Sequence, residues 1–125
     1  DLAQGPCVIK RLRGCGAGCE YVAITPEGDI YPCHQFVGNE DYKLGSLYDG
    51  TFDKELSGRF AGLNIYTREE CKDCWARFYC SGGCSASNLL VNGDIKKPHR
   101  VGCELERKRL ECAIALRAIA AGMAE

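Results

Sequence analysis

The pattern of apolar and polar residues is most informative between residues 21 and 33. Tyr21–Thr25 (YVAIT) and Ile30–Cys33 are rich in β-branched and aromatic residues, and Pro26-Glu27-Gly28-Asp29 separates them. Such residues favour strands, whereas Pro and Gly at these offsets favour a tight turn. The pattern predicts a β-hairpin in which Cys33 lies across from about Val22.

Two segments have helical periodicity instead. Phe52, Leu56 and Phe60 recur every four residues, which predicts a short helix over about 52–61. A longer helix is predicted from about Glu104 to Ala121. One of its faces would be apolar and packed, with Cys112 as a buried structural thiol, and its members are Leu105, Cys112, Leu116 and Ile119.

The remaining segments are predicted to be loops and turns. Gly5–Gly18 is rich in glycine and cysteine, Leu44–Leu47 reads as a loop, and a cysteine-rich loop runs from Cys71 to about Ser87. Asn92-Gly93 is typical of a second small hairpin. We therefore expect a small α+β domain with little regular structure, organised by metal and formed by residues 1–125 as one unit.

Composition narrows the function classes. The 125 residues include ten cysteines and carry a net charge of −1. Basic residues are dispersed and not interleaved with aromatics, which argues against a nucleic-acid partner. No apolar run is long enough for a bilayer, and the first residues do not resemble a signal peptide, so we expect a cytoplasmic protein. The missing initiator Met predicts a fragment of a longer chain.

The spacing of the cysteines indicates a metal centre. Cys71-x2-Cys74-x5-Cys80-x3-Cys84 is followed by Cys103 after eighteen residues. Close spacings of this kind suit thiolates that converge on metal, whereas a CxxC pair rarely forms a bridge in a disulfide framework. Gly82 and Gly83 would let the backbone and its N–H groups approach the sulfurs.

The hairpin suggests a second group of thiols. Cys33 and Cys19 would be roughly 10 Å apart along the predicted strand, so the chain before Tyr21 has to curl back for them to meet. The glycines at 14, 16 and 18 permit that curl. Cys15 and Cys33 can then share one site. Cys19 is a tentative further ligand, and Cys7 is a weaker alternative.

Seven cysteines in register, together with the segments TPEGDIYPC, LGSL and CSGGC, resemble the SPASM domain of radical S-adenosylmethionine (radical-SAM) peptide-modifying enzymes. The segments GPCVIKRLRGCGAG and YPCHQFVG are similar to the maturases that form thioethers in six-cysteine (SCIFF) peptides. The resemblance implies two [4Fe–4S] clusters. The implied ligands are Cys15, Cys33, Cys84 and tentatively Cys19 for the first cluster, and Cys71, Cys74, Cys80 and Cys103 for the second.

The resemblance also implies a role. The chain would be an auxiliary cluster domain that helps bind a cysteine-rich precursor peptide and transfers electrons during thioether formation. Its partners would be that peptide, a reductant protein and an upstream catalytic barrel that binds S-adenosylmethionine. The CxxxCxxC motif for cleaving this cofactor is absent here, because Val22 and Ser87 stand where its third cysteine would follow. We therefore expect no activity from this chain alone.

Three further expectations concern the clusters and the competing interpretation. Cys103 would lie just before the C-terminal helix, whose positive N-terminus favours a thiolate-ligated cluster. Trp75, Phe78 and Tyr79 would shield a cluster from water.

The alternative function is a structural zinc module that uses Cys71, Cys74, Cys80 and Cys84. A single zinc site would leave Cys15, Cys33 and Cys103 without a role.

Overall fold

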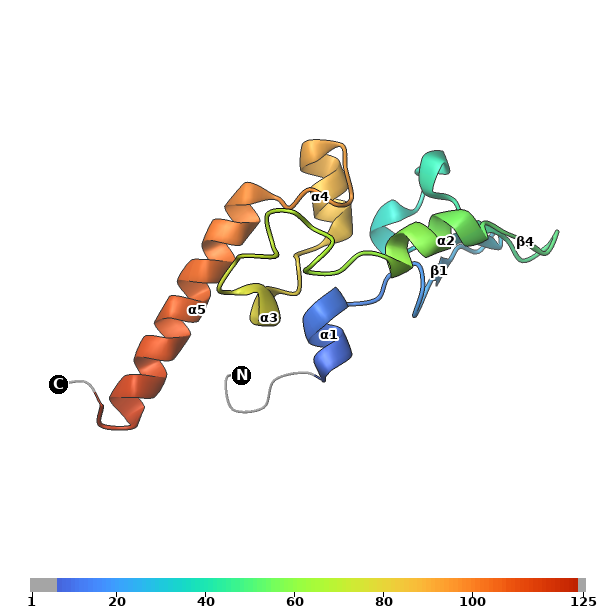
Figure 1. The fold of residues 1–125 in the computed structure, drawn as a ribbon. Helices are drawn as coiled ribbons and strands as arrows, with labels where there is room; N and C mark the ends of the chain where they lie inside the picture. The colour runs from blue at the N-terminus through green and yellow to red at the C-terminus, as the bar shows by residue number, and fades with distance from the viewer. Residues whose placement is uncertain (1–6, 124–125) are drawn as a thin grey trace.

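The computed structural model describes residues 7–123, with a small sheet at one end and a long helix at the other (Figure 1). The sheet has four short antiparallel strands in the order β1-β2-β3-β4, which are Ala23–Ile24, Asp29–Tyr31, Gly45–Ser46 and Thr51–Phe52. Two 3-10 turns, η1 (His34–Phe36) and η2 (Glu40–Tyr42), connect β2 to β3. The predicted small α+β class is confirmed.

The first hairpin is present with shorter strands than predicted. Its turn is closed by the N–H of Gly28, which donates to the carbonyl of Thr25 at 2.9 Å, and Gly28 has a left-handed φ of 82°. Ala23 pairs with Tyr31. Continued along the strands, this register places Cys33 opposite residue 21, one position from the predicted partner.

The segment Leu44–Leu47 is not a loop, because Gly45 and Ser46 form β3. Glycine is required there: Gly45 has a φ of 153°, and a Cβ would lie 2.0 Å from the carbonyl oxygen of Thr51 on β4. The two strands therefore approach more closely than any side chain at position 45 would allow.

Helix α2 (Lys54–Ala61) covers the sheet and supplies part of the core. The Asp53 carboxylate caps its N-terminus by accepting the N–H of Leu56 at 2.8 Å. Leu56 and Phe60 are buried as predicted, whereas Phe52 belongs to β4 and is 44% exposed. The core residues are Ile30, Tyr31, Cys33, Phe36, Leu44, Leu56, Phe60, Leu63, Ala86 and Ile95.

Two segments predicted to be loops contain helices. Helix α1 (Val8–Arg13) lies inside the predicted glycine-rich loop and ends at Gly14, whose N–H donates to the carbonyl of Lys10 at 2.9 Å. Residues 5 and 6 of that prediction lie outside the described range. Helix α3 (Arg77–Cys80) interrupts the cysteine-rich loop.

The second hairpin was predicted wrongly, since helix α4 (Ser85–Asn92) takes its place. Gly93 has a φ of 69°, and its N–H donates to the carbonyl of Leu89 at 2.8 Å. A glycine in this conformation ends a helix as readily as it forms a hairpin turn. The Asn-Gly pair is therefore compatible with a hairpin turn and with a helix end, and here it ends a helix.

Helix α5 (Arg100–Ala120) begins earlier than predicted. Cys103 therefore lies within its first turn rather than before it, and its N–H donates to the carbonyl of His99 at 3.0 Å. Among the described residues of α5 only Leu110 is buried. The packed apolar face was predicted wrongly, because its four members are exposed: Leu105, Cys112, Leu116 and Ile119.

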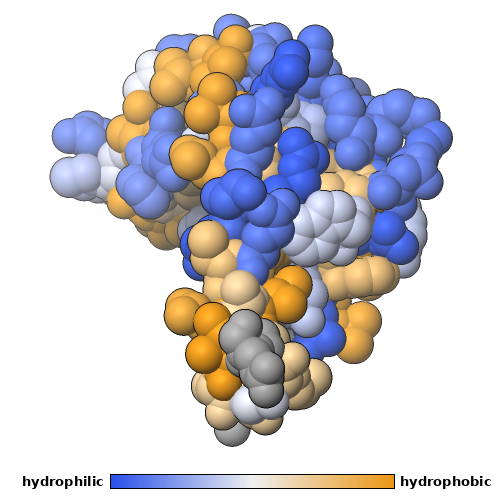
Figure 2. Space-filling model, turned by 90° about the vertical axis from the view of Figure 1, so that its left-hand side faces the viewer, coloured by the Kyte–Doolittle hydropathy of each residue, from blue (hydrophilic) through white to orange (hydrophobic). Residues whose placement is uncertain are grey.

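Exposed apolar residues occur along α5, and those near its C-terminal end form the apolar surface in the lower part of Figure 2. Periodicity predicts which residues share a face of the helix, but not whether a neighbouring element covers that face.

Within residues 7–123, none of the helices combines the length and apolar composition needed to cross a bilayer.

Candidate metal centre

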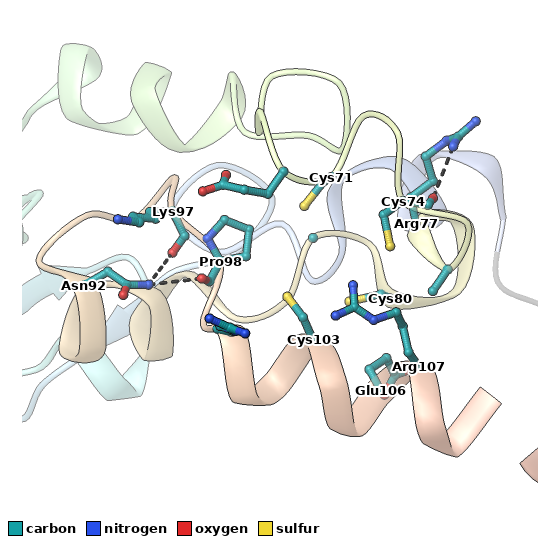
Figure 3. A pocket seen from close by; sticks show the side chains of 14 residues that line it. Cys71, Cys74, Arg77, Cys80, Asn92, Lys97, Pro98, Cys103, Glu106 and Arg107 are labelled. Carbon is teal, nitrogen blue, oxygen red and sulfur yellow. Dashed lines mark hydrogen bonds between the residues drawn. The ribbon is translucent and has the colours of Figure 1, made fainter. Parts of the chain in front are cut away.

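Four thiols surround one cavity between the cysteine-rich loop and α5. They are Cys71, Cys74, Cys80 and Cys103, and the cavity has a volume of about 420 Å³. Figure 3 shows their sulfur atoms pointing into a common space. These are the four residues that the resemblance assigns to the second cluster.

Local hydrogen bonds set the direction of each thiol. The N–H of Cys71 donates to the carbonyl of Arg68 at 2.9 Å, and the N–H of Cys74 donates to the carbonyl of Cys71 at 3.0 Å, so this pair lies on a tight turn. Cys80 is the last residue of helix α3. Left-handed φ angles of 60°, 86° and 74° at Ser81, Gly82 and Gly83 then turn the chain away.

Burial dominates the acidity of Cys71, Cys80 and Cys103. It raises the pKa of Cys71 to about 11 and also raises the pKa values of Cys80 and Cys103. The N–H groups of Gly82 and Gly83 act in the opposite direction on Cys80, and so does Arg107 on Cys103. A thiolate in this cavity therefore requires a cation beside it, and a metal supplies one.

The cavity also carries donors suited to a negatively charged cluster. Arg77 lines it, and its Nη1 donates to the carbonyl of Cys74 at 3.1 Å, but its buried Nε has no partner within the described part of the chain. An unpartnered buried N–H is costly unless an acceptor is bound. Arg107 extends from α5 toward Cys80 and Cys103 (Figure 3). Four thiols and these donors fit an iron–sulfur cluster.

A second group of thiols forms where the hairpin meets the start of α4. The hydroxyl of Tyr21 donates to the sulfur of Cys15 at 3.8 Å, and Nε2 of Gln35 donates to the sulfur of Cys84 at 3.7 Å. Partial burial, the hydrogen bond to Cys15, and the charges of Cys15, Cys33 and Cys84 raise the pKa of Tyr21 to about 12. Three of the predicted first-cluster residues are therefore close enough for their charges to act on the same hydroxyl.

Cys84 is the N-cap residue of α4. Burial raises its pKa, but the N–H groups of Ser87 and Ala86, the hydroxyl of Ser87 and the amide of Gln35 outweigh that effect and lower it. The thiol makes no capping hydrogen bond of full geometry, so these donors act on it at longer range. The lowered pKa favours the thiolate form of Cys84.

Cys19 points elsewhere. Its thiol donates to the carbonyl of Gly16 at 3.4 Å and lines a small separate cavity beside Arg13, Phe60 and Ser85. Cys7 is exposed at the N-cap of α1. The structure therefore groups Cys15 with Cys33 and Cys84, and Cys19 lines a different cavity.

The two cysteine groups lie next to one another. A further cavity of about 320 Å³ is lined by Cys80 and Cys103 of one group and by Cys84 of the other. The five-residue segment Cys80–Cys84 therefore supplies one thiol to each group, as the resemblance implies. Its left-handed residues are the physical reason that the two thiols diverge.

The aromatic residues of the cysteine loop do not line the cavity of about 420 Å³, and Trp75 is 51% exposed. Tyr79 does line the cavity of about 320 Å³ with thiols of both groups, so its shielding role stays a prediction. The residues that do accompany the thiols were missed from the sequence, namely Tyr21, Gln35, Arg68 and Arg77. Single polar residues carry no spacing signal that would have indicated them.

The comparisons with known proteins relate this chain to an iron–sulfur domain. Residues 15–75 match the family model of the SPASM iron–sulfur cluster-binding domain. A PqqA peptide cyclase of Xanthomonas axonopodis pv. citri is 28% identical over 101 residues, which are 75% of this chain and 27% of the relative. A serine-type anaerobic sulfatase-maturating enzyme of Bacteroides thetaiotaomicron is 29% identical over 99 residues, 74% of this chain and 23% of the relative.

A third relative carries no assigned activity. This uncharacterized protein of Archaeoglobus fulgidus is 30% identical over 101 residues, which are 78% of this chain and 24% of the relative. The chain thus spans about a quarter of the length of these curated relatives. None of the three is named as a SCIFF maturase.

Proposed function

We propose, from the membership of residues 15–75 in the SPASM family of iron–sulfur cluster-binding domains, that this chain is the auxiliary cluster part of a radical-SAM enzyme that modifies a peptide or protein. The relatives named as a peptide cyclase and a sulfatase-maturating enzyme support a polypeptide substrate. Within that class, the SCIFF-like segments favour thioether formation in a cysteine-rich precursor, and a reductant protein would complete the system.

The observation that carries the proposal is the cavity bounded by Cys71, Cys74, Cys80 and Cys103. These thiols would hold one [4Fe–4S] cluster, and Cys15, Cys33 and Cys84 would hold the other. When bound, such clusters supply one-electron transfer at potentials set by burial, charge and hydrogen bonds to sulfur. The chain's own contribution is to orient the thiols, to exclude water from the cavity and to place positive charge beside it.

Three thiols at the first site would leave one iron without a protein ligand. Because Cys19 lines a different cavity, the chain offers no fourth cysteine at that place in its described arrangement. An iron of this kind could accept a cysteine of the precursor peptide, and peptide binding would then depend on the first site more than on the second.

The cavity favours a cluster over the alternative zinc module. Tetrahedral zinc needs four ligands within about 2.3 Å of one point. In the described residues, no group of three or more His, Cys, Asp or Glu side chains is close enough to hold a single ion. The zinc interpretation would also place Cys84 with Cys71 and Cys74, whereas Cys84 lies beside Gln35 instead.

Anaerobic reconstitution followed by iron and sulfide analysis tests the proposal. About eight irons and eight sulfides per chain support two [4Fe–4S] clusters, and about one or two zinc ions without iron would contradict the proposal.

Assignment of the thiols of the first site needs a double-mutant cycle. Cys33→Ser and Cys84→Ser should each remove about four irons. The double variant should also lose about four rather than eight, because both thiols serve one cluster.

A further inference from the structure

Arg68 is a buried cation between the two cysteine groups. Its side chain is almost fully enclosed, with 3% of the residue exposed, and the ion pairs recorded for residues 7–123 do not include it. A buried guanidinium stays charged and is costly to bury without an anion nearby.

The hydrogen bonds of Arg68 join three segments. Nη1 donates to the carbonyls of Ile95 at 2.6 Å and Lys96 at 3.0 Å, and Nη2 donates to the hydroxyl of Ser85 at 3.0 Å. The backbone carbonyl of Arg68 accepts the N–H of Cys71. Because Ser85 directly follows Cys84, this one residue contacts the start of the second group and the neighbour of a first-group thiol.

The groups that act electrostatically on Arg68 are thiols of both sites. Burial lowers its pKa, while Cys71, Asp94, Cys80 and Cys84 act in the opposite direction. Conversely, Arg68 opposes the effect of burial on Cys71. The only carboxylate in this set, Asp94, belongs to an exposed residue and forms no recorded ion pair with Arg68 in the described chain.

One N–H of Arg68 has no partner. Nε is buried and unpaired among the described residues, and it lies beside Gly82, where an added Cβ would come within 2.9 Å of both Nε and Cδ. Gly82 itself lines the cavity of the second cysteine group. The guanidinium is therefore directly behind the cavity wall, and only a glycine at 82 leaves room for it there.

We propose that Arg68 is a positioning residue and a shared counter-charge for both cysteine sites, which raises the reduction potentials of the two centres together. This inference rests on the proposed iron–sulfur function. Adding an electron makes a thiolate-ligated cluster more negative, and a fixed positive charge nearby stabilises that reduced form. Because thiols of both groups act electrostatically on the Arg68 side chain, which lies behind Gly82 and bonds Ser85, its removal should affect both centres. A residue that served one group would affect one.

Potentiometric titration of the reconstituted protein, followed by electron paramagnetic resonance, tests the inference. Arg68→Gln should move both midpoint potentials to more negative values by about 59 mV each, which corresponds to a tenfold change in the one-electron equilibrium. Arg117→Gln removes the same charge from the exposed part of α5 and should leave both potentials unchanged. Unchanged potentials in loaded Arg68→Gln, or a change in only one centre, would overturn the inference.

Arg68→Lys separates charge from hydrogen-bonded structure. Lysine keeps the charge but not the planar fork, so this variant should load iron and keep potentials near those of the parent protein. If Arg68→Gln fails to take up iron, Arg68→Lys decides the matter: loading with parental potentials supports the counter-charge, and failure to load overturns it. A parent protein that takes up no iron would instead contradict the proposed function itself.

Discussion

The sheet end and the α5 end of this molecule are stabilised by different means. The sheet end buries ten residues in one apolar core, to which α4 and the following loop contribute Ala86 and Ile95. Helix α5 has 21 residues, yet only Leu110 among those described is buried. Between the two ends lies a cavity surrounded by thiols. The comparison indicates that one end folds by burying apolar side chains, and from the proposed function we expect the other to depend on metal ligation.

Removal of the iron should have the largest effect, and it should act more strongly on the α5 end, because the sheet end keeps its apolar core when the clusters are lost. Oxidation and chelation of the reconstituted protein would remove the cluster that Cys71 and Cys103 are proposed to ligate together. We expect amide hydrogen exchange to lose protection over residues 71–80 and 100–110, while β2 and α2 keep most of theirs. Simultaneous loss of protection in β2 and α2 would show that the two ends form one cooperative unit.

Leu110 provides the next test, because it is the buried contact of α5. Leu110→Ala should destabilise this end by about 3 kcal/mol, since it removes a buried side chain and leaves a cavity. Leu116→Ala makes the same change at a position that is 67% exposed and should cost less than about 0.5 kcal/mol. Thermal unfolding of the loaded proteins measures both changes. Equal effects would mean that a partner covers the exposed face of α5.

Gly45 is the corresponding test at the sheet end. Gly45→Ala should destabilise the sheet by about 2 kcal/mol, because its Cβ would collide with the carbonyl of Thr51 in β4. Gly38 also has a positive φ but has no atom within 4 Å of an added Cβ, so Gly38→Ala isolates the backbone strain. Hydrogen exchange should rise in β2 and β3 with the first variant and not in α5. Increased exchange in α5 would contradict the separation of the two ends.

The sequence predicted the sheet end better than the α5 end for a physical reason. The signals of the hairpin and α2 are local: a Pro–Gly turn, and apolar residues four positions apart. Gly93 carried a local signal too, but a left-handed glycine ends a helix as well as it forms a turn. The predicted burial of Cys112 required a neighbouring element to cover it, and periodicity gives no information on such a neighbour.

The cysteine groups show the same limit. Spacing predicted that Cys71, Cys74 and Cys80 share a site, because residues a few positions apart in a loop are confined to one region. Spacing could not predict the place of Arg68. Its side chain donates to the backbone carbonyl of Ile95, a residue that is distant in sequence. The placement of Cys19 in a different cavity was equally beyond spacing, since it depends on how the glycines around it turn the chain.

Cys19 gives the smallest expected effect, and it distinguishes a three-thiol first site from a four-thiol one. Cys19→Ser should retain about eight irons, because its thiol bonds to Gly16 and lines a cavity apart from Cys15. Cys15→Ser is the matched control and should lose about four, since its sulfur lies beside Tyr21 with the other thiols of that group. An added small thiol should change the electron paramagnetic resonance signal of the parent protein and of Cys19→Ser in the same way if one iron is open in both. Loss of about four irons in Cys19→Ser would instead make Cys19 the fourth ligand and close that iron to substrate.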